Sequence, residues 1–293
     1  MEETISNTEH ISETILNTIN NIFNQLFSSI DNSIYGILDD FAFIDTSILN
    51  DTLFEKIFGT NSSNGLLLIA NSLLIAFSLY YCFKLLYSHF SSIQIENPYQ
   101  FVFKLLIFGI CINCSYFLIG QVLDLVSTIT LALRGIGEDL FNKNICFSEL
   151  IVEINKSNLL DKSSDIFSLD GIIKASLSVS LLNLVFTYSF RYVMIKIFIL
   201  ITPFAILSLI LENTSWFFRA WIRNLFSLLF IQIIVSIVLL ILFSMDYSSS
   251  NLMIKFIYVG AIYALIKANS FARDFLGGVS TTFSQNVENL FKK

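Results

Sequence analysis

The chain has 293 residues, of which 55% are hydrophobic and 14% are charged. Soluble domains carry about 25% charged residues, so this composition excludes an ordinary soluble globular protein. The formal net charge of -6 is concentrated at the start of the chain, where residues 1–64 hold ten Asp or Glu side chains and a single lysine.

Residues 1–64 form an acidic N-terminal region with the pattern of an amphipathic helix. Its apolar residues recur at helical spacing with polar residues between them: Ile11, Ile15, Ile19, Phe23, Phe27 and Ile30. We expect this helix to pack against the rest of the chain. The alternative is a helix that binds a partner or lies on the bilayer surface, although an acidic face is unsuited to anionic lipids.

The region 65–133 is predicted to hold two membrane spans, at residues 65–87 and 101–133. A helix needs about 20 apolar residues to cross the hydrocarbon core of a bilayer, and both stretches meet that length. Pro98 marks the turn between them. The second stretch is longer than the bilayer requires, so its end is expected to project into the headgroups or water.

Residues 134–171 are predicted to form an extracytoplasmic loop, with enough spaced apolar residues for one short helix. The region 172–268 is predicted to hold the third, fourth and fifth spans, the last two at residues 217–243 and 253–268. Residues 269–293 keep an apolar stripe at helical spacing and are predicted to be an amphipathic C-terminal tail.

The third span lies in an apolar run, residues 171–210, that Arg191, Lys196 and Pro203 interrupt. We expect one long span that ends near Lys196 or Pro203 and is followed by a membrane-surface or re-entrant segment, because residues 191–196 and their flanks lack the Gly, Pro or Asn typical of a turn. A hairpin of two spans that turns at residues 191–196 is the alternative. The predicted fold is therefore all-α: a polytopic membrane protein with about five transmembrane helices and amphipathic helices at both ends.

The orientation of the spans follows from the lysines and arginines of the connecting segments, which favour the cytoplasmic side. With five spans and the N-terminus outside, ten basic residues lie on the cytoplasmic side and seven on the outer side. We therefore expect the N-terminus outside and the C-terminus inside.

Polar side chains within the spans are candidates for interior positions, since lipid cannot satisfy them. They are Asn71, Asn113, Asn183, Gln232 and Ser236, together with Arg191, the one charge whose position within a span is arguable. Small residues four apart, Gly260, Ala264 and Ala268, are typical of a face on which helices pack closely.

The fourth span begins with a basic and aromatic collar, in which Arg219 and Arg223 flank Trp221. Such residues anchor a span at the cytoplasmic interface, where the arginine side chains reach the headgroups and tryptophan lies at the boundary. No nucleotide-binding loop, metalloprotease motif or nucleophile elbow occurs in the sequence. We therefore expect no catalytic, cofactor-binding or metal site.

The order of features in residues 172–285 resembles the TrbL family, the polytopic inner-membrane subunits of conjugative type IV secretion systems. An apolar span is followed by "ITPFAIL" with Pro203, then by "FRAWIRNLFSLLFIQIIVSIVLLIL" with Trp221 and Gln232, a short last span and a tail with small residues. The resemblance implies that Pro203 ends the third span, that Trp221 is the family tryptophan, and that Gln232 faces the bundle.

The resemblance also implies a function, and a non-enzymatic one. Several copies would assemble in the cytoplasmic membrane of a bacterium and help build the channel through which relaxase-bound DNA, or protein, leaves the cell. Other secretion subunits and their ATPases would be the partners. Two alternatives remain open from the sequence: a small-solute transporter or channel, and an immunity or exclusion factor that acts by binding another machine.

Overall fold

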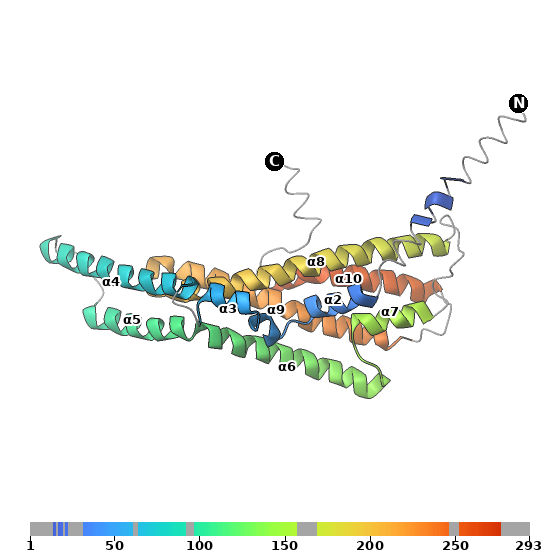
Figure 1. The fold of residues 1–293 in the computed structure, drawn as a ribbon, viewed down its shortest axis with the longest axis horizontal. Helices are drawn as coiled ribbons and strands as arrows, with labels where there is room; N and C mark the ends of the chain where they lie inside the picture. The colour runs from blue at the N-terminus through green and yellow to red at the C-terminus, as the bar shows by residue number, and fades with distance from the viewer. Residues whose placement is uncertain are drawn as a thin grey trace, which may run out of the picture.

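The computed structural model describes residues 14–15, 17–19, 21–22, 32–60, 64–91, 97–156, 169–245 and 252–276. Throughout these ranges the regular secondary structure is helical, which confirms the all-α prediction (Figure 1). The elements in chain order are α2 (Asn32–Ala42), η1 (Thr46–Leu49), α3 (Thr52–Phe58), α4 (Leu66–Ser91), α5 (Pro98–Asn113), α6 (Ser115–Phe141), α7 (Phe147–Lys156), α8 (Leu169–Leu207), η2 (Glu212–Thr214), α9 (Ser215–Phe243) and α10 (Leu252–Leu276).

Four of the described helices are long and apolar enough to cross a membrane. They are α4, α6, α8 from Gly171 onward, and α9 together with η2. The chain thus has the makeup of a multi-pass membrane protein. The predicted fifth span, residues 253–268, is part of the 25-residue helix α10, which is not among these four.

The second predicted span, residues 101–133, is not a single helix. It consists of α5 and α6, which follow one another in the same direction with a bend at Cys114, whose φ of -88° and ψ of 3° depart from helical values (Figure 1). Two polar side chains bond to backbone carbonyls at this bend, Asn113 to Gly109 O at 2.8 Å and Ser115 to Ile112 O at 2.6 Å. Such local bonds compete with the helical ladder. The pattern of apolar residues gives no sign of this competition, so the sequence did not predict the bend.

α8 is one continuous helix of 39 residues, so the chain does not turn back at residues 191–196 and the hairpin alternative is not found. The expectation that Pro203 ends this helix is wrong, because α8 continues through Pro203 and ends one turn later at Leu207. A proline removes one backbone N–H donor. Where other helices surround it, as they surround the buried Pro203, the helix need not stop.

One other predicted boundary differs from the structure. α6 continues to Phe141, well into the predicted loop 134–171, and ends where Asn142 adopts a left-handed φ of 53°. The short helix predicted in that loop is α7. Of the predicted N-terminal helix only short pieces between residues 14 and 22 are described, and they are helical and exposed. Residues 277–293 of the predicted tail lie outside the described ranges.

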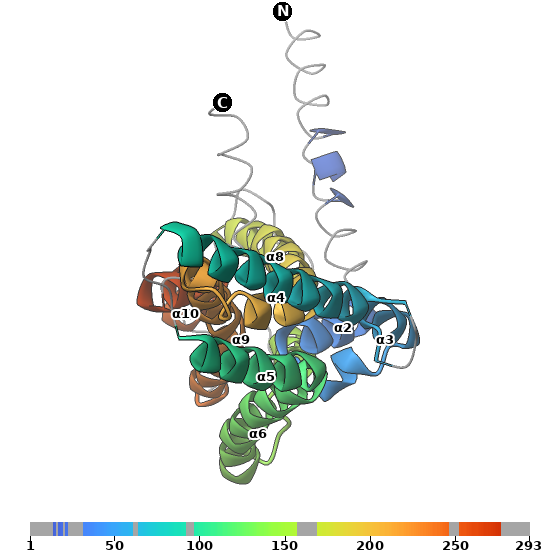
Figure 2. The ribbon, with the colours of Figure 1, turned by 90° about the vertical axis from the view of Figure 1, so that its left-hand side faces the viewer.

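The helices form an elongated bundle (Figures 1 and 2). α8, α9 and α10 lie side by side, and α6 packs against α9 and α8. α4 and α5 lie next to each other and extend past the other helices at one end. The segment from α2 to α3 lies against the middle of this bundle, where α2 contacts both α7 and α8.

Candidate functional site

The most unusual side chain of the described structure is Arg191, near the middle of α8. It is the largest of the fully buried side chains, with 0% of its surface exposed. Burying an ionised group costs several kcal/mol unless hydrogen bonds replace the lost water. Arg191 therefore identifies a place where the bundle supplies polar partners in an apolar setting.

The partners of Arg191 are oxygen atoms of neutral groups. Its Nη1 donates to the carbonyl oxygens of Phe41 at 3.2 Å and Ala42 at 3.0 Å, and its Nε donates to Leu228 O at 2.8 Å. Phe41 and Ala42 are the last two residues of α2. The final carbonyls of a helix lack intrahelical donors and carry partial negative charge, so the guanidinium is a suitable cap for α2.

Gln232 on α9 completes this site. Its Oε1 accepts from Arg191 Nη2 at 3.4 Å and from the backbone N–H of Ile44 at 3.2 Å. Gln232 is fully buried, and its Nε2 has no hydrogen-bond partner among the described residues. One side-chain oxygen thereby joins α8, α9 and the chain that follows α2.

A second polar contact lies at the other side of α2. The half-buried Asp39 accepts hydrogen bonds from Phe147 N at 2.7 Å, Ser148 N at 3.1 Å and Ser148 Oγ at 2.5 Å. Phe147 and Ser148 begin α7, so Asp39 caps that helix from a distant part of the sequence. Burial raises the pKa of Asp39, an effect that these hydrogen bonds and the charge of Arg134 offset only in part.

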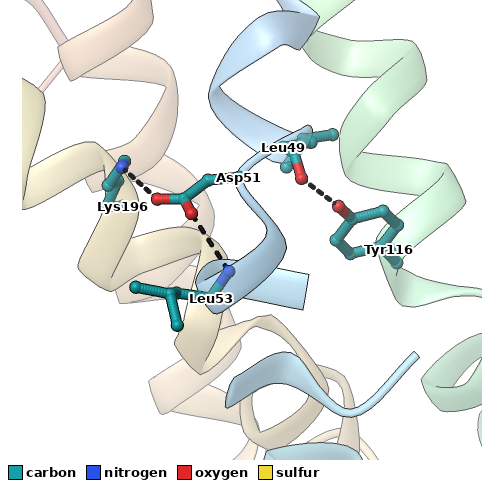
Figure 3. Close-up of polar contacts among 5 residues, drawn as sticks. All are labelled: Leu49, Asp51, Leu53, Tyr116 and Lys196. Atoms are coloured by element: carbon teal, nitrogen blue, oxygen red, sulfur yellow. Dashed lines mark hydrogen bonds and ion pairs between the residues drawn. The ribbon is translucent and has the colours of Figure 1, made fainter. Parts of the chain in front are cut away.

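A third contact ties α3 to α8 (Figure 3). Asp51 accepts from Leu53 N at 3.0 Å and thereby caps α3, while Lys196 Nζ lies 3.4 Å from its other oxygen. The hydrogen bond from Leu53 N, with Lys196 as a further cause, holds the pKa of Asp51 below its usual value. Close by, Tyr116 of α6 donates its hydroxyl to Leu49 O at 2.5 Å.

The predicted collar of α9 is only partly as expected. Arg219 and Arg223 are exposed, and so is Trp216 at 66%. Trp221 is 6% exposed and donates its indole N–H to Phe198 O on α8 at 2.9 Å. Trp221 is therefore a packing residue between α8 and α9, and its predicted role as an interfacial anchor is wrong.

The other predicted site residues are dispersed through the structure. The prediction that Gln232 faces the bundle is confirmed, as is the interior position of Arg191. Asn113 is exposed, so its predicted interior position is not found; it exchanges hydrogen bonds with Asn71 at 3.1 and 3.3 Å, which link α5 to α4. Asn183 is half-buried on α8.

The predicted packing face of α10 is buried at one position only. Ala268 is 2% exposed, but Gly260 and Ala264 are exposed. A Cβ added at Gly260 would meet nothing within 4 Å. The Gly260 and Ala264 part of the stripe thus faces away from α8 and α9, because α10 packs on them through larger residues such as Tyr258, Ile262 and Leu265.

Sequence reasoning missed the role of residues 39–51 altogether. The carboxylates of Asp39 and Asp51 were counted only as part of an acidic region. The signal that could have found them is the N-cap pattern at Asp51, which directly precedes a short amphipathic stretch. The partners of Arg191 on α2 are backbone atoms, so no residue type in the sequence indicates them.

Within the ranges described by the structure, no group of three or more His, Cys, Asp or Glu residues could hold a metal ion. Comparisons of the chain with protein-family models, with curated proteins and with solved structures give no match.

Proposed function

We propose that this protein is a non-enzymatic, multi-pass membrane subunit of a conjugative type IV secretion channel, which helps form the passage across the cytoplasmic membrane for relaxase-bound DNA or for protein. Other secretion subunits and their ATPases would be its partners, and several copies would assemble together. The resemblance of residues 172–285 to the TrbL family supports this proposal.

The structural observation that carries the proposal is the buried polar site around Arg191. Ionisable groups inside membrane helices are expensive, and they commonly mark the pathways of substrates or ions. In α8 and α9, Arg191 and Gln232 face each other within the stretch that resembles the family. A polar interior is what a subunit lining or gating a passage for charged substrates needs.

The proposed topology has five crossings, with the N-terminus outside and the C-terminus inside. The crossings are α4, the α5–α6 pair, α8, α9 and α10. α5 and α6 count as one because the chain does not reverse direction between them (Figure 1). Residues 134–171, including α7, would then be extracytoplasmic.

The function is tested by deleting the gene in its host and counting conjugative transfer to a recipient. We expect transfer to vanish and to return when the intact chain is supplied from a plasmid, whereas the empty plasmid restores nothing. Unchanged transfer after the deletion would remove the secretion proposal. Solute flux through the purified protein would then become the question to ask.

The topology is tested with the same complementing plasmid. In a variant with Cys82, Cys111, Cys114 and Cys146 replaced by serine, a cysteine introduced at Ser6 should react with an impermeant maleimide in intact cells. A cysteine at Asn142, in the proposed outer loop, should react as well. Protection of both positions from the reagent, with normal labelling after the membrane is permeabilised, would reverse the proposed orientation.

A further inference from the structure

Buried polar side chains follow one another along α8 and along α9, and Arg191 meets Gln232 between the two helices. Thr187 lies one turn before Arg191 on α8, and Gln232 and Ser236 lie one turn apart on α9. All four side chains are fully buried. Thr187 Oγ1 and Gln232 Nε2 have no hydrogen-bond partner among the described residues. We call these four residues the polar seam.

The segment that covers the polar seam is residues 32–58, which runs from α2 to α3. It contacts the seam through backbone groups: the carbonyl oxygens of Phe41 and Ala42 bond to Arg191, and the N–H of Ile44 bonds to Gln232. These groups lie where α2 ends and the chain becomes irregular. Arg191 and the side-chain oxygen of Gln232 are thus bonded to this segment, and these groups and their backbone partners would need water if the two separated.

The contacts that hold the edges of this segment are also polar. Asp39 is bonded to the start of α7, and Asp51 is paired with Lys196 of α8. Water can replace the Asp51–Lys196 ion pair at little net cost, because such a pair at the protein surface contributes only about 0–1 kcal/mol. These polar attachments at the edges can exchange their partners for water, whereas the buried apolar side chains of the segment, such as Leu38, Ile48 and Phe54, hold it by packing.

The end of the segment is built like a pivot. α3 ends at Gly59, which has a left-handed φ of 94°, and the backbone of Gly65 lies against it. A Cβ at Gly65 would come within 2.4 Å of Gly59 Cα. Hinges are commonly a few residues at the ends of elements that can absorb changes of φ and ψ, and glycine absorbs them most easily.

We propose that residues 32–58 are a removable plug over the polar seam, with Arg191 as the latch that holds the end of α2. With the plug in place, the space between α8 and α9 is dry and closed. With the plug released, Thr187, Arg191, Gln232 and Ser236 face water. This inference rests on the proposed function only in that a channel subunit needs a closed state; the release itself can be measured without any transport.

The test uses a reporter cysteine at Thr187 in a variant whose four native cysteines are replaced by serine, purified at full length and placed in lipid nanodiscs. A water-soluble methanethiosulfonate reports exposure of the reporter. The variant Arg191→Gln removes the latch. We expect it to raise the labelling rate about tenfold or more over the chain with Arg191, because several hydrogen bonds of the closed state are lost.

A reversible crosslink separates release of the plug from misfolding. Asp39→Cys and Ser148→Cys replace two side chains whose oxygens lie 2.5 Å apart, so a disulfide there would tie α2 to α7. In the Arg191→Gln background, oxidation of this pair should return the reporter to its slow labelling rate, and reduction should restore fast labelling. A misfolded chain would label at the same rate in both redox states.

Two results of the labelling experiment would overturn the proposal that residues 32–58 are a removable plug. One is a reporter that stays unlabelled in Arg191→Gln with the cysteine pair reduced. The other is a labelling rate that the disulfide does not change. The matched control is the pair Asp40→Cys and Ser148→Cys, in which the exposed Asp40 replaces Asp39. Oxidant should leave the labelling of that variant unchanged.

The role of the plug in the cell is tested by conjugative transfer with the same cysteine pair in a chain that keeps Arg191. We expect oxidant to lower transfer and reductant to restore it. If the gene deletion abolishes transfer but the oxidised pair transfers at the full rate, the plug is refuted as a working gate and the secretion function stands. If the deletion has no effect while labelling shows release, the secretion function fails and the plug stands.

Discussion

Gln232 accepts two hydrogen bonds on one side-chain oxygen, one from Arg191 and one from the backbone of Ile44. These donors belong to segments that are 41 and 188 residues away in the chain. The oxygen therefore fixes the position of the α2 end relative to α8 and α9. A substitution at this residue should act on both contacts at once.

Replacing Gln232 by leucine should lower the stability of the folded protein. The change leaves the N–H of Ile44 and one N–H of Arg191 without an acceptor, and each buried unsatisfied group costs about 1–3 kcal/mol. The free energy of unfolding can be measured by steric trapping in bicelles. Gln121→Leu on the exposed face of α6 is the matched control, with an expected change within about 0.5 kcal/mol. Equal effects of the two substitutions would contradict this description of the site.

Substitution by phenylalanine should have different effects on stability at Trp221 and at Trp216. Trp221→Phe removes the indole hydrogen bond to Phe198 O and should cost about 0.5–1.5 kcal/mol of unfolding free energy. The exposed Trp216 should tolerate the same change within about 0.5 kcal/mol. A larger loss of unfolding free energy at Trp216 than at Trp221 would contradict this. It would show that tryptophan is required at the membrane–water interface rather than at the α8–α9 contact.

The amide pair between α4 and α5 should show a small favourable coupling. Asn71 and Asn113 each donate to the other, and side-chain hydrogen bonds between membrane helices average about 0.6 kcal/mol. A double-mutant cycle with Asn71→Ala and Asn113→Ala measures this coupling directly. If the two single effects simply add, the hydrogen bonds do not form in the bilayer.

Asp39 and Asp51 should titrate on opposite sides of the ordinary aspartate pKa of 3.8. Burial raises the pKa of Asp39, so its contribution to stability is present below pH 3.8 and is lost as the pH rises through the raised pKa. The hydrogen bond from Leu53 N lowers the pKa of Asp51, so its contribution is present above pH 3.8 and is lost as the pH falls through the lowered pKa. Carboxyl ¹³C NMR measures both pKa values, and the variants Asp39→Asn and Asp51→Asn assign the two resonances. The reverse order of the two midpoints would contradict the geometry.

Much of the fold follows from the apolar runs of the sequence. The uninterrupted runs of α4 and α9 could be located closely, and the lack of turn residues at 191–196 correctly favoured one helix in α8. The bend at Cys114 could not be seen in this way. It depends on which backbone carbonyls the side chains of Asn113 and Ser115 reach, and hydropathy carries no information on that.

At Trp221 and in α10, residue spacing alone did not tell which face of the helix is buried. Arg219 and Arg223 lie two residues on either side of Trp221, and residues two apart on a helix point in nearly opposite directions. The collar therefore has an exposed basic face and a buried aromatic one. In α10, spacing showed that Gly260 and Ala264 share a face, but not which neighbour that face meets.

The buried site was only half visible in the sequence. Arg191 stood out as a charge within a long apolar run, and Gln232 as a polar residue within another. Their link to residues 41–44 depends on backbone atoms, which every residue carries. Contacts of that kind can be found only when the chain is folded.

The latch at Arg191 is tested most directly by its removal. Arg191→Met leaves the carbonyl oxygens of Phe41, Ala42 and Leu228 without this donor, so the unfolding free energy measured by steric trapping should fall by about 3 kcal/mol or more. Arg223→Met, at an exposed position of the neighbouring helix, should change it by less than about 0.5 kcal/mol. If the two variants are equally stable, the guanidinium of Arg191 does not hold the end of α2, and the account of the buried site is wrong.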